Sequence, residues 1–191
     1  MDKPKVHYFY AQGLEDQWIV ENLALPEKGF YVDIGAAHPR TTSNTAFLRD
    51  LGWEGLAIDG DPVWSELWQD IPTFICAVIS NEPHVQFFQD RDNPYCSRIG
   101  EIAGATSRAT VAIEECLSSF KVGKIDFLSV DVEGKEFDVL RSFNFELHDP
   151  PIIMVEWNTA GIGHDDRCRT LLGDLGYDLK LENMINLVFA K

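Results

Sequence analysis

Short apolar runs that end in small or acidic residues alternate along this chain with stretches of helical periodicity. The first run, Phe30–Ile34, is broken by one acid, Asp33, and is followed by Gly35. A short run rich in aromatic and β-branched residues that ends at a turn is typical of a buried parallel strand. In the polar run after it, Ser43 or a neighbour can cap a helix that extends through Leu51. Strand, tight turn and capped helix predict the first crossing of a nucleotide-binding α/β sheet.

The same alternation continues to the end of the chain. Further strands are predicted at Gly55–Asp59, Thr73–Ile79, Ile125–Val130 and Ile152–Val155, with an antiparallel edge piece at His84–Phe88 and a closing hairpin at Tyr177–Glu182 and Ile185–Ala190. Helices are predicted at residues 14–23, 62–71, 111–120 and 167–175, with one more after Gly134. Strands that alternate with helices predict an α/β three-layer sandwich around a mostly parallel sheet. Because no repeat or linker divides residues 1–191, we expect a single domain.

Two segments stand outside this alternation. Residues 1–28 form a helical lead-in, whose helix can lie over a ligand cleft or simply pack on the core. Residues 89–110 are the least regular part of the chain, and a loop of this length in a compact domain is usually functional or mobile. We interpret it as a lid or substrate segment in which Arg98 and Arg108 can meet an anionic or sugar substrate. A disordered surface loop is the alternative.

Charge limits the class of partner. The chain has 31 acidic residues against 16 Lys and Arg, and a formal net charge of −15. Nucleic-acid binding draws its affinity from clustered cations, so RNA and DNA are disfavoured as substrates. We attribute the acidity itself to solubility.

The cysteines and the apolar runs bear on location. Cys76, Cys96, Cys116 and Cys168 form no CxxC pair and no cluster with histidine, which disfavours a zinc site and a disulfide framework. The N-terminus shows no apolar signal region, and no apolar run approaches membrane-spanning length. We therefore expect a reduced, cytoplasmic protein that does not enter the membrane.

The ends of the first two strands indicate the ligand. Asp59 ends the second strand, where an acid can accept hydrogen bonds from both ribose hydroxyls of a nucleoside. The glycines of a dinucleotide fingerprint are missing after Gly35, and Pro39 removes one backbone N–H that a pyrophosphate would use. S-adenosylmethionine carries no phosphate and needs no such cradle, and Asp33 suits the ammonium of its methionyl part. The alternatives are that Asp33 only caps the turn and that Asp59 is merely exposed.

Other polar residues follow the strand ends less specifically. Ser80 and Asn81 come after the third strand, where they can meet an adenine, although a plain β-turn explains them equally well. His38 stands next to the predicted cofactor turn, and Pro39 alone can account for its position. His164 lies beside Asp165 in the loop after the fifth strand, where a histidine can take a hydroxyl proton or simply be exposed to solvent.

The carboxyl ends of the fourth and fifth strands carry most of the candidate catalytic chemistry. Asp131 and Glu133 are two apart and project to the same side while the strand continues. Glu156 and Asn158 follow the fifth strand. Carboxylate and amide oxygens suit Mg²⁺, as in catechol-type methyltransferases, but a carboxylate can equally act as a direct general base. We rank the direct role of Asp131, Glu133 and Glu156 first and a metal held by Asp131, Glu156 and Asn158 second. A structural role, in which Asp131 caps the turn before Gly134, is third.

Several motifs together resemble the FkbM-type family of S-adenosylmethionine-dependent methyltransferases, over nearly the whole chain. The motifs are Gln12 with Glu15-Asp16, FYVDIGA at Phe30–Ala36, Ser43-Asn44-Thr45, Asp59 before Asp61-Pro62, IDFLSVDVEGKEFDVL at Ile125–Leu140, IIMVEWN at Ile152–Asn158 and a terminal GY…N…VF. The resemblance implies a Rossmann-like class I methyltransferase sheet with strand order 3-2-1-4-5-7-6 and a C-terminal antiparallel hairpin. It also implies O-methyl transfer, often to sugars or natural products.

We therefore expect an S-adenosylmethionine-dependent O-methyltransferase that acts on a small-molecule or glycan hydroxyl and can form a homodimer. A cofactor-binding or regulatory domain without catalysis, or a nicotinamide oxidoreductase, are the alternatives. The predicted cofactor contacts are Asp33, Gly35, Ala36, His38, Asp59, Asp61, Ser80, Asn81 and Asp131, and the predicted catalytic residues are Asp131, Glu133, Glu156 and His164.

Overall fold

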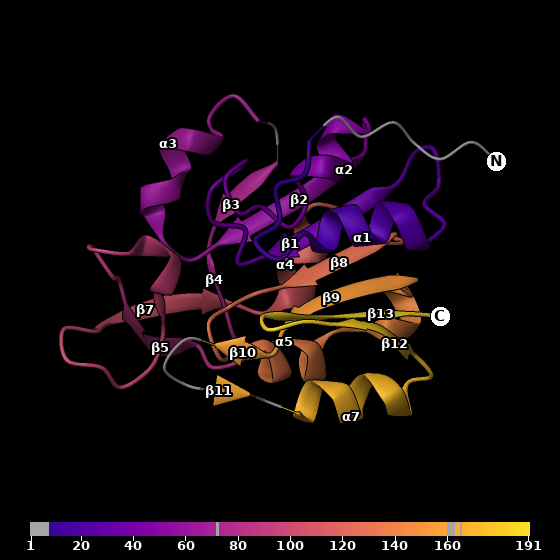
Figure 1. Ribbon diagram of the computed structural model, residues 1–191. Helices are drawn as coiled ribbons and strands as arrows, with labels where there is room; N and C mark the ends of the chain where they lie inside the picture. The colour runs from indigo at the N-terminus through magenta and orange to yellow at the C-terminus, as the bar shows by residue number, and fades with distance from the viewer. Residues whose placement is uncertain (1–7, 72, 160–162, 165) are drawn as a thin grey trace.

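The computed structural model describes residues 8–71, 73–159, 163–164 and 166–191, and their central feature is a seven-stranded sheet (Figure 1). Its order is β12-β13-β9-β8-β1-β2-β3, and only β13 and β12 run antiparallel to their neighbours. The strands are β1 (Phe30–Ile34), β2 (Glu54–Asp59), β3 (Phe74–Cys76), β8 (Phe127–Val130), β9 (Ile152–Glu156), β12 (Asp178–Glu182) and β13 (Asn186–Ala190). This topology confirms the predicted order 3-2-1-4-5-7-6 and its closing hairpin.

Helices cover both faces of this main sheet, which confirms the three-layer sandwich (Figure 1). On one face α1 (Glu15–Asn22) and α2 (Ala46–Asp50) pack with Tyr31 and Phe127. On the other, α4 (Ile113–Ser119), α5 (Glu136–Ser142) and α7 (Arg167–Asp174) pack with Val32 and Leu128. Adjacent strand residues thus enter different cores, because successive side chains of a strand point to opposite faces. That is why these strands are apolar at nearly every position.

A small sheet extends the fold between β3 and α4. Its order is β4-β7-β5-β6, formed by β4 (Val78–Ile79), β5 (His84–Phe88), β6 (Arg98–Ile99) and β7 (Thr106–Val111). The predicted strand over residues 73–79 is therefore divided at Ala77, whose N–H donates to the carbonyl of Asp59 at 2.8 Å. The antiparallel pairing of β5 is confirmed, but β5 lies inside the small sheet and not at an edge.

The expectation that residues 89–110 are irregular is wrong in part. They contain η2 (Pro94–Cys96), β6 and most of β7. The two strands escaped the apolar pattern because β6 is two residues long and β7 is largely polar, so backbone pairing and not burial defines them. Their role as a lid or substrate segment stays a prediction.

Several helix boundaries also differ from the predicted ones. The expected helix over residues 62–71 is a short η1 (Pro62–Trp64) followed by α3 (Ser65–Trp68), and α6 (Phe145–His148) was not predicted. The N-cap residue of α2 is Thr45, whose side chain makes no capping bond, while the hydroxyl of Ser43, the predicted cap, accepts the Ala46 N–H at 3.1 Å. None of the helices in the described part of the chain has the length and apolar character needed to span a membrane.

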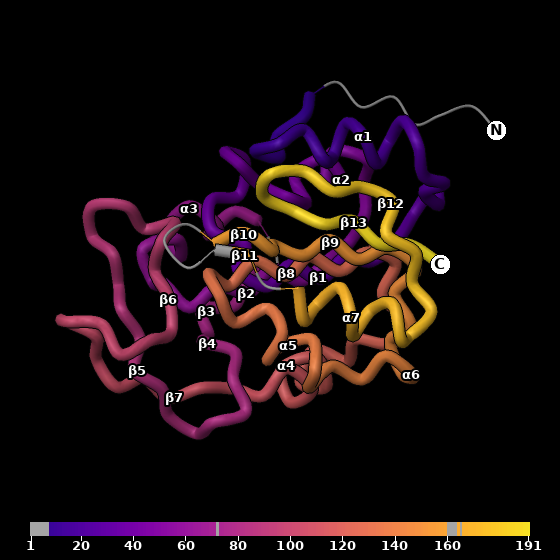
Figure 2. The backbone as a smooth tube through the Cα atoms, turned by 60° about the horizontal axis from the view of Figure 1, so that its bottom comes forward, coloured from indigo at the N-terminus to yellow at the C-terminus, as the bar shows by residue number. Residues whose placement is uncertain are grey.

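The N-terminal lead-in is attached to the closing hairpin, and Figure 2 shows the hairpin running beside α1. Glu15 is fully buried and accepts hydrogen bonds from the side-chain amides of Asn183 at 2.7 Å and Asn186 at 2.8 Å. Ile19 and Val20 of α1 enter the core, which supports core packing for this helix. Residues 1–7 of the predicted lead-in lie outside the described residues.

Candidate active site

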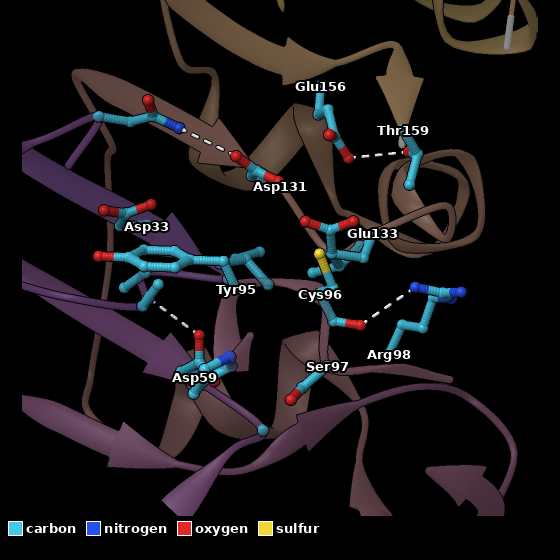
Figure 3. A pocket seen from close by; sticks show the side chains of 18 of the residues that line it. Asp33, Asp59, Tyr95, Cys96, Ser97, Arg98, Asp131, Glu133, Glu156 and Thr159 are labelled. Atoms are coloured by element: carbon cyan, nitrogen blue, oxygen red, sulfur yellow. Dashed lines mark hydrogen bonds between the residues drawn. The ribbon is translucent and has the colours of Figure 1, made fainter. Parts of the chain in front are cut away.

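A cavity of about 1020 Å³ lies at the carboxyl ends of β1, β2, β8 and β9 (Figure 3). The segment Asn93–Ile99, which includes η2 and β6, provides a further wall. This is where ligands of open α/β sheets bind. The volume is at the upper end of the usual range for small-molecule sites, which leaves room for a nucleoside cofactor together with an acceptor. Among the predicted site residues, those that line the cavity are Asp33, Gly35, Ala36, Asp59, Asp131, Glu133, Glu156 and Asn158, together with Arg98.

The turn after β1 brings the backbone close to the next strand ends. Gly35 has φ 85°, and a Cβ at this position would lie 1.5 Å from the carbonyl oxygen of Asp131. The N–H groups of Gly35 and Ala36 both donate to the carbonyl of Ile58, at 2.8 and 3.1 Å. Only glycine permits this approach of β1 to β8, so Gly35 gives the cavity floor its shape.

Asp59 is fixed by the backbone on two sides. Its Oδ2 accepts the Ala37 N–H at 2.9 Å, and its Oδ1 accepts the Asp61 N–H at 2.7 Å. Burial raises the pKa of this carboxyl to about 6. Each carboxylate oxygen keeps a second lone pair, so the group can still accept from two ribose hydroxyls. The Ala37 N–H already donates to Asp59, so the turn has fewer free backbone N–H groups for a pyrophosphate than a dinucleotide-binding turn has.

Asp33 is almost fully buried, with 1% of its surface exposed. Its Oδ2 accepts the Thr45 hydroxyl at 2.6 Å, while its Oδ1 is buried without a hydrogen-bond partner among the described residues. Burial raises the pKa of this group as well. A buried carboxylate oxygen without a donor is costly, and an ammonium group in the cavity would relieve that cost.

A second set of acids converges at the ends of β8 and β9, and Figure 3 shows Asp131, Glu133 and Glu156 turned toward one region of the cavity. Burial, then the charge of Asp131, raises the pKa of Glu133 to about 8. Burial, then the charge of Glu133, raises the pKa of Glu156 to about 8. The pKa of Asp131 is also raised, first by burial and then by Glu156. This acidic corner therefore carries more carboxylates than it can hold ionised without a cation or protons.

Glu133 differs from its neighbours in backbone and in contacts. Its φ is 57°, in the left-handed region that side chains other than glycine rarely adopt. Its Oε2 is buried without a hydrogen-bond partner among the described residues. Backbone strain of this kind concentrates at functional sites, where the surrounding structure maintains it.

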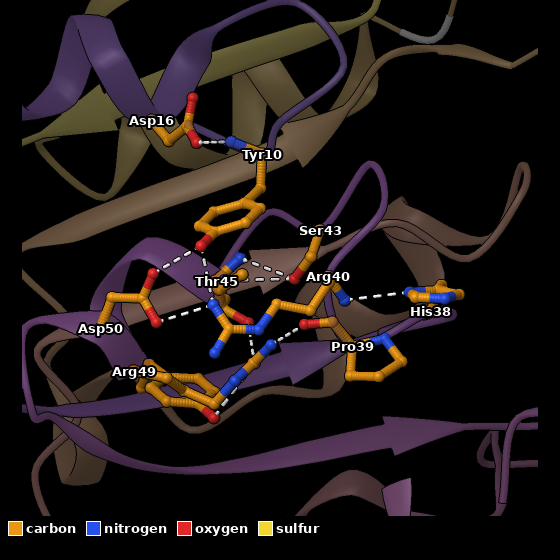
Figure 4. Close-up of polar contacts among 11 residues, drawn as sticks. Tyr10, Asp16, His38, Pro39, Arg40, Ser43, Thr45, Arg49 and Asp50 are labelled. Atoms are coloured by element: carbon orange, nitrogen blue, oxygen red, sulfur yellow. Dashed lines mark hydrogen bonds and ion pairs between the residues drawn. The ribbon is translucent and has the colours of Figure 1, made fainter. Parts of the chain in front are cut away.

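Two predicted cofactor residues near the turn support the loops around the cavity and do not line it. The Nδ1 of His38 accepts the backbone N–H of Arg40 at 3.0 Å (Figure 4). It also accepts the backbone N–H of Thr41 at 3.0 Å. Burial lowers the pKa of His38, in keeping with a neutral ring that accepts. Asp61 is 1% exposed and accepts from the Gln89 amide and the Ser97 hydroxyl, both at 2.7 Å.

Three more predicted residues also lie outside the cavity lining. The Ser80 hydroxyl accepts the Glu82 N–H at 3.1 Å, and Asn81 is exposed. Both observations favour the alternative that these residues form a plain turn. The exposed His164 stacks on Trp157 with 4.1 Å between ring centroids. Its neighbour Asp165 lies outside the described residues.

Sequence reasoning missed several residues that line the cavity or adjoin it. Tyr95 and Trp64 form an aromatic pair with centroids 4.9 Å apart, and both line the cavity. Glu136, at the start of α5, lies within reach of Asp131 and Glu156. Asn186 opens β13 opposite Glu156. Glu136 and Asn186 belong to motifs that carry the family resemblance, but the pattern of their segments indicated ordinary helix and strand, so the tertiary fold is needed to place them at the site.

Comparison with known proteins points to one family. The model of the family described as Methyltransferase FkbM domain matches residues 33–179. No curated protein matches the sequence. In fold, the chain is similar to the fibrillarin pre-rRNA processing protein of Methanococcus jannaschii, with 14% identity, a TM-score of 0.51 and coverage of 90% of this chain and 71% of that chain. It is also similar to a putative rRNA-methylase from Clostridium thermocellum, with 12% identity, a TM-score of 0.51 and coverage of 96% and 97%.

Proposed function

The chain belongs to the methyltransferase FkbM domain family, and from that membership we propose that it transfers a methyl group from S-adenosylmethionine to a hydroxyl of a sugar, polysaccharide or natural-product-like small molecule. The family and the Rossmann-like methyltransferase fold make it a methyltransferase. The observation that carries the choice of cofactor is the arrangement of Asp33 and Asp59 on either side of the Gly35 turn, in one cavity.

The residues present fit this cofactor. Asp59 has acceptor capacity left for the ribose hydroxyls, while Asp33 offers an unsatisfied oxygen to the ammonium group. Ala36 and the tight turn at Gly35 allow close approach without a phosphate cradle. When bound, S-adenosylmethionine supplies an electrophilic methyl group on its sulfonium.

The acidic corner serves the acceptor in this proposal. As the acceptor oxygen bonds to the methyl carbon, the hydroxyl proton passes to a carboxylate, and the other product is S-adenosylhomocysteine. All three acids line the cavity and can take this proton when ionised, and Glu133 is distinguished by a buried Oε2 that has no donor among the described residues. The remaining contribution of the protein is to position the acceptor and exclude water.

An RNA acceptor has less support. Both solved structures are described in terms of rRNA, but they share the fold with this chain at low identity. This chain carries 31 acids against 16 Lys and Arg, and Arg98 is the one Lys, Arg or His side chain among the described residues that line the cavity. A phosphate backbone would meet repulsion at such a surface. We therefore favour a small-molecule or glycan acceptor.

A titration of the protein with S-adenosylmethionine and with NADH tests the cofactor. We expect saturable binding of the former alone. Incubation of a metabolite extract with cofactor carrying a deuterated methyl group should then yield products that carry the label. Binding of NADH alone would overturn the cofactor assignment. Tight binding of S-adenosylmethionine without labelled product from small-molecule or glycan fractions would favour a cofactor-binding domain without catalysis.

A further inference from the structure

Three carboxylates from different elements meet at one side of the cavity. Asp131 follows β8, Glu136 opens α5 and Glu156 ends β9, and one oxygen from each lies within 4.8 Å of the others. Glu136 and Glu156 are 2% and 6% exposed. Glu136 also hydrogen-bonds to Glu156, and three carboxyl groups this close and this buried cannot all be ionised unless a cation compensates them. For Asp131 and Glu156, the described residues supply no ion pair with Lys, Arg or His.

Each carboxylate is oriented by a donor of the protein. Glu136 Oε1 accepts two backbone N–H groups, from Val132 at 2.9 Å and Gly134 at 3.0 Å. Glu156 Oε2 accepts the Thr159 hydroxyl at 2.8 Å. Asp131 Oδ2 lies 3.5 Å from the side-chain amide of Asn44. Outer hydrogen bonds of this kind hold metal ligands in place and select which oxygen faces the ion.

Asn186 provides an independent sign of a missing ligand. It is 2% exposed, and its Oδ1 is buried without a hydrogen-bond partner among the described residues. Its Nδ2 donates to Glu15 at 2.8 Å, which fixes the amide so that Oδ1 faces away from Glu15. Asn186 is also the direct partner of Glu156 in the antiparallel ladder. Their side chains therefore project from the same face of the sheet into the cavity that both line.

From this arrangement we infer that the protein binds a hard divalent cation between Asp131, Glu136 and Glu156, with the amide oxygen of Asn186 toward the ion. All four donors are oxygens, which suits Mg²⁺, Mn²⁺ or Ca²⁺ and not the softer metals. The donor set differs from the one expected from the sequence. It gains Glu136 and Asn186 and leaves out Asn158, because the Oδ1 of Asn186, unlike that of Asn158, is a buried oxygen without a hydrogen-bond partner among the described residues.

This is a binding property of the protein that does not depend on methyl transfer. Protons shared among the carboxylates would neutralise the same charge without a metal. A site built for a cation should bind Mn²⁺, whereas carboxyl groups that only share protons should not. The test uses Mn²⁺ as the probe, with free and bound ion distinguished by electron paramagnetic resonance, in the presence and absence of S-adenosylmethionine. We expect one bound Mn²⁺ per chain, which Mg²⁺ displaces.

Two substitutions locate the site. Glu136→Gln and Glu156→Gln keep an oxygen for the Val132, Gly134 and Thr159 donors but remove one charge each. Since loss of an outer-shell partner alone costs roughly 10–100-fold in metal affinity, each variant should weaken Mn²⁺ binding at least about tenfold. Asn158→Ala should stay within about twofold of the wild type, and the exposed Glu146→Gln is the charge-matched control.

Circular dichroism establishes that each variant is folded, and Asp131→Asn replaces any that is not. No Mn²⁺ bound to the wild-type protein, with or without cofactor, would overturn the inference in favour of shared protons. Equal affinity of wild type, Glu136→Gln and Glu156→Gln would overturn the assigned ligands. A loss in Asn158→Ala alone would restore the site expected from the sequence. None of these outcomes bears on whether the protein binds S-adenosylmethionine.

Discussion

The main sheet and the small sheet face the same cavity but hold their residues in different ways. In the main sheet, β1, β8 and β9 are buried along almost their whole length and joined by continuous parallel ladders. The carboxylates at their ends are therefore positioned by backbone pairing. In the small sheet, β6 is two residues long, and every position of β7 is exposed or half-buried.

Side-chain hydrogen bonds supplement the few buried apolar residues of the small sheet, Val78, Ile79 and Phe87. The buried Asp61 holds this wall against the main sheet by accepting from Gln89 and from Ser97. Arg108 adds a bond to the carbonyl of Gly60 at 3.3 Å. Regions with few buried contacts open locally at low free-energy cost. The acids therefore stand on a rigid frame formed by β1, β8 and β9. The wall that carries Tyr95 and Arg98 depends on a few polar bonds, and we expect acceptor selection to vary there.

The largest expected effect is at the rigid frame. Asp131→Asn removes a carboxylate from the acidic corner, and turnover should fall by roughly 10²–10⁴ if the group acts on the acceptor proton directly. The rate of label transfer to the acceptor, with and without chelator, measures it, and the exposed Asp174→Asn is the control.

Chelation separates the roles of Asp131. If the cation is needed for catalysis, chelator should stop the wild-type enzyme and Mg²⁺ should restore it, while cofactor affinity stays nearly unchanged. If Asp131 acts alone, chelator should have no effect. Full activity of Asp131→Asn in chelator would leave Asp131 with a purely structural role at the turn before Gly134.

The second effect tests the cofactor side of the same frame. Asp59→Ala should weaken S-adenosylmethionine binding by about 1.5–3 kcal/mol through loss of charge-assisted contacts to the ribose. The unfolding transition should remain cooperative, because the group stands at a strand end. Calorimetric titration measures the affinity, and the exposed Asp70→Ala should match the wild type. Unchanged affinity of Asp59→Ala would remove the ribose assignment.

The sequence predicted the main sheet because its signal is local. Buried parallel strands are runs of apolar residues, and the acids that end them, such as Asp59 and Asp131, are marked by their position after the run. In the small sheet, β5 was predicted, but β6 and β7 gave no such signal, because Arg98–Ile99 and Thr106–Val111 are defined by pairing with β5 and not by burial. The apolar pattern of the sequence therefore predicts strands that are buried and misses strands that are defined by backbone pairing alone.

The acidic corner shows a second limit. Glu136 has the sequence context of an exposed charge at the start of an amphipathic helix, yet it is 2% exposed beside two other acids. Asn186 is held by Glu15, 171 positions away. Contacts of such separation are decided by how the layers pack, and no spacing along the chain encodes them.

The third effect loosens the small sheet and leaves the main sheet intact. Ser97→Ala deletes the hydroxyl that donates to Asp61 at 2.7 Å and accepts the Asp90 N–H at 3.0 Å. The local cost should be about 1–2 kcal/mol, since one bond is to a charged group. Amide hydrogen exchange should speed up in residues 89–99 and stay unchanged in β1 and β8. Equal acceleration in both sheets would show that the two do not open separately, and Ser118→Ala is the exposed control.

The smallest effect follows from the titration of Asp59, whose pKa burial raises to about 6. The ionised carboxylate accepts ribose hydroxyls best, so S-adenosylmethionine affinity should fall about threefold as the pH is lowered from about 6.5 to about 5.5. Stability should respond in the opposite direction. A carboxyl whose pKa is higher in the folded state contributes stability that is fully present below the unfolded pKa and is lost as the pH rises through about 6.

Asp59→Asn isolates the contribution of this carboxyl to the pH dependence of cofactor affinity and of stability, because it keeps an oxygen for the Ala37 N–H but cannot titrate. Subtracting its affinity and unfolding curves from those of the wild type removes the contributions of the acidic corner, where the pKa values of Glu133 and Glu156 are raised to about 8. The difference should show tighter binding and lower stability as the pH rises through about 6. If Asp59→Asn retains the wild-type slope of affinity with pH, the titrating group lies elsewhere, and the rigid frame does not tune cofactor binding through this carboxylate.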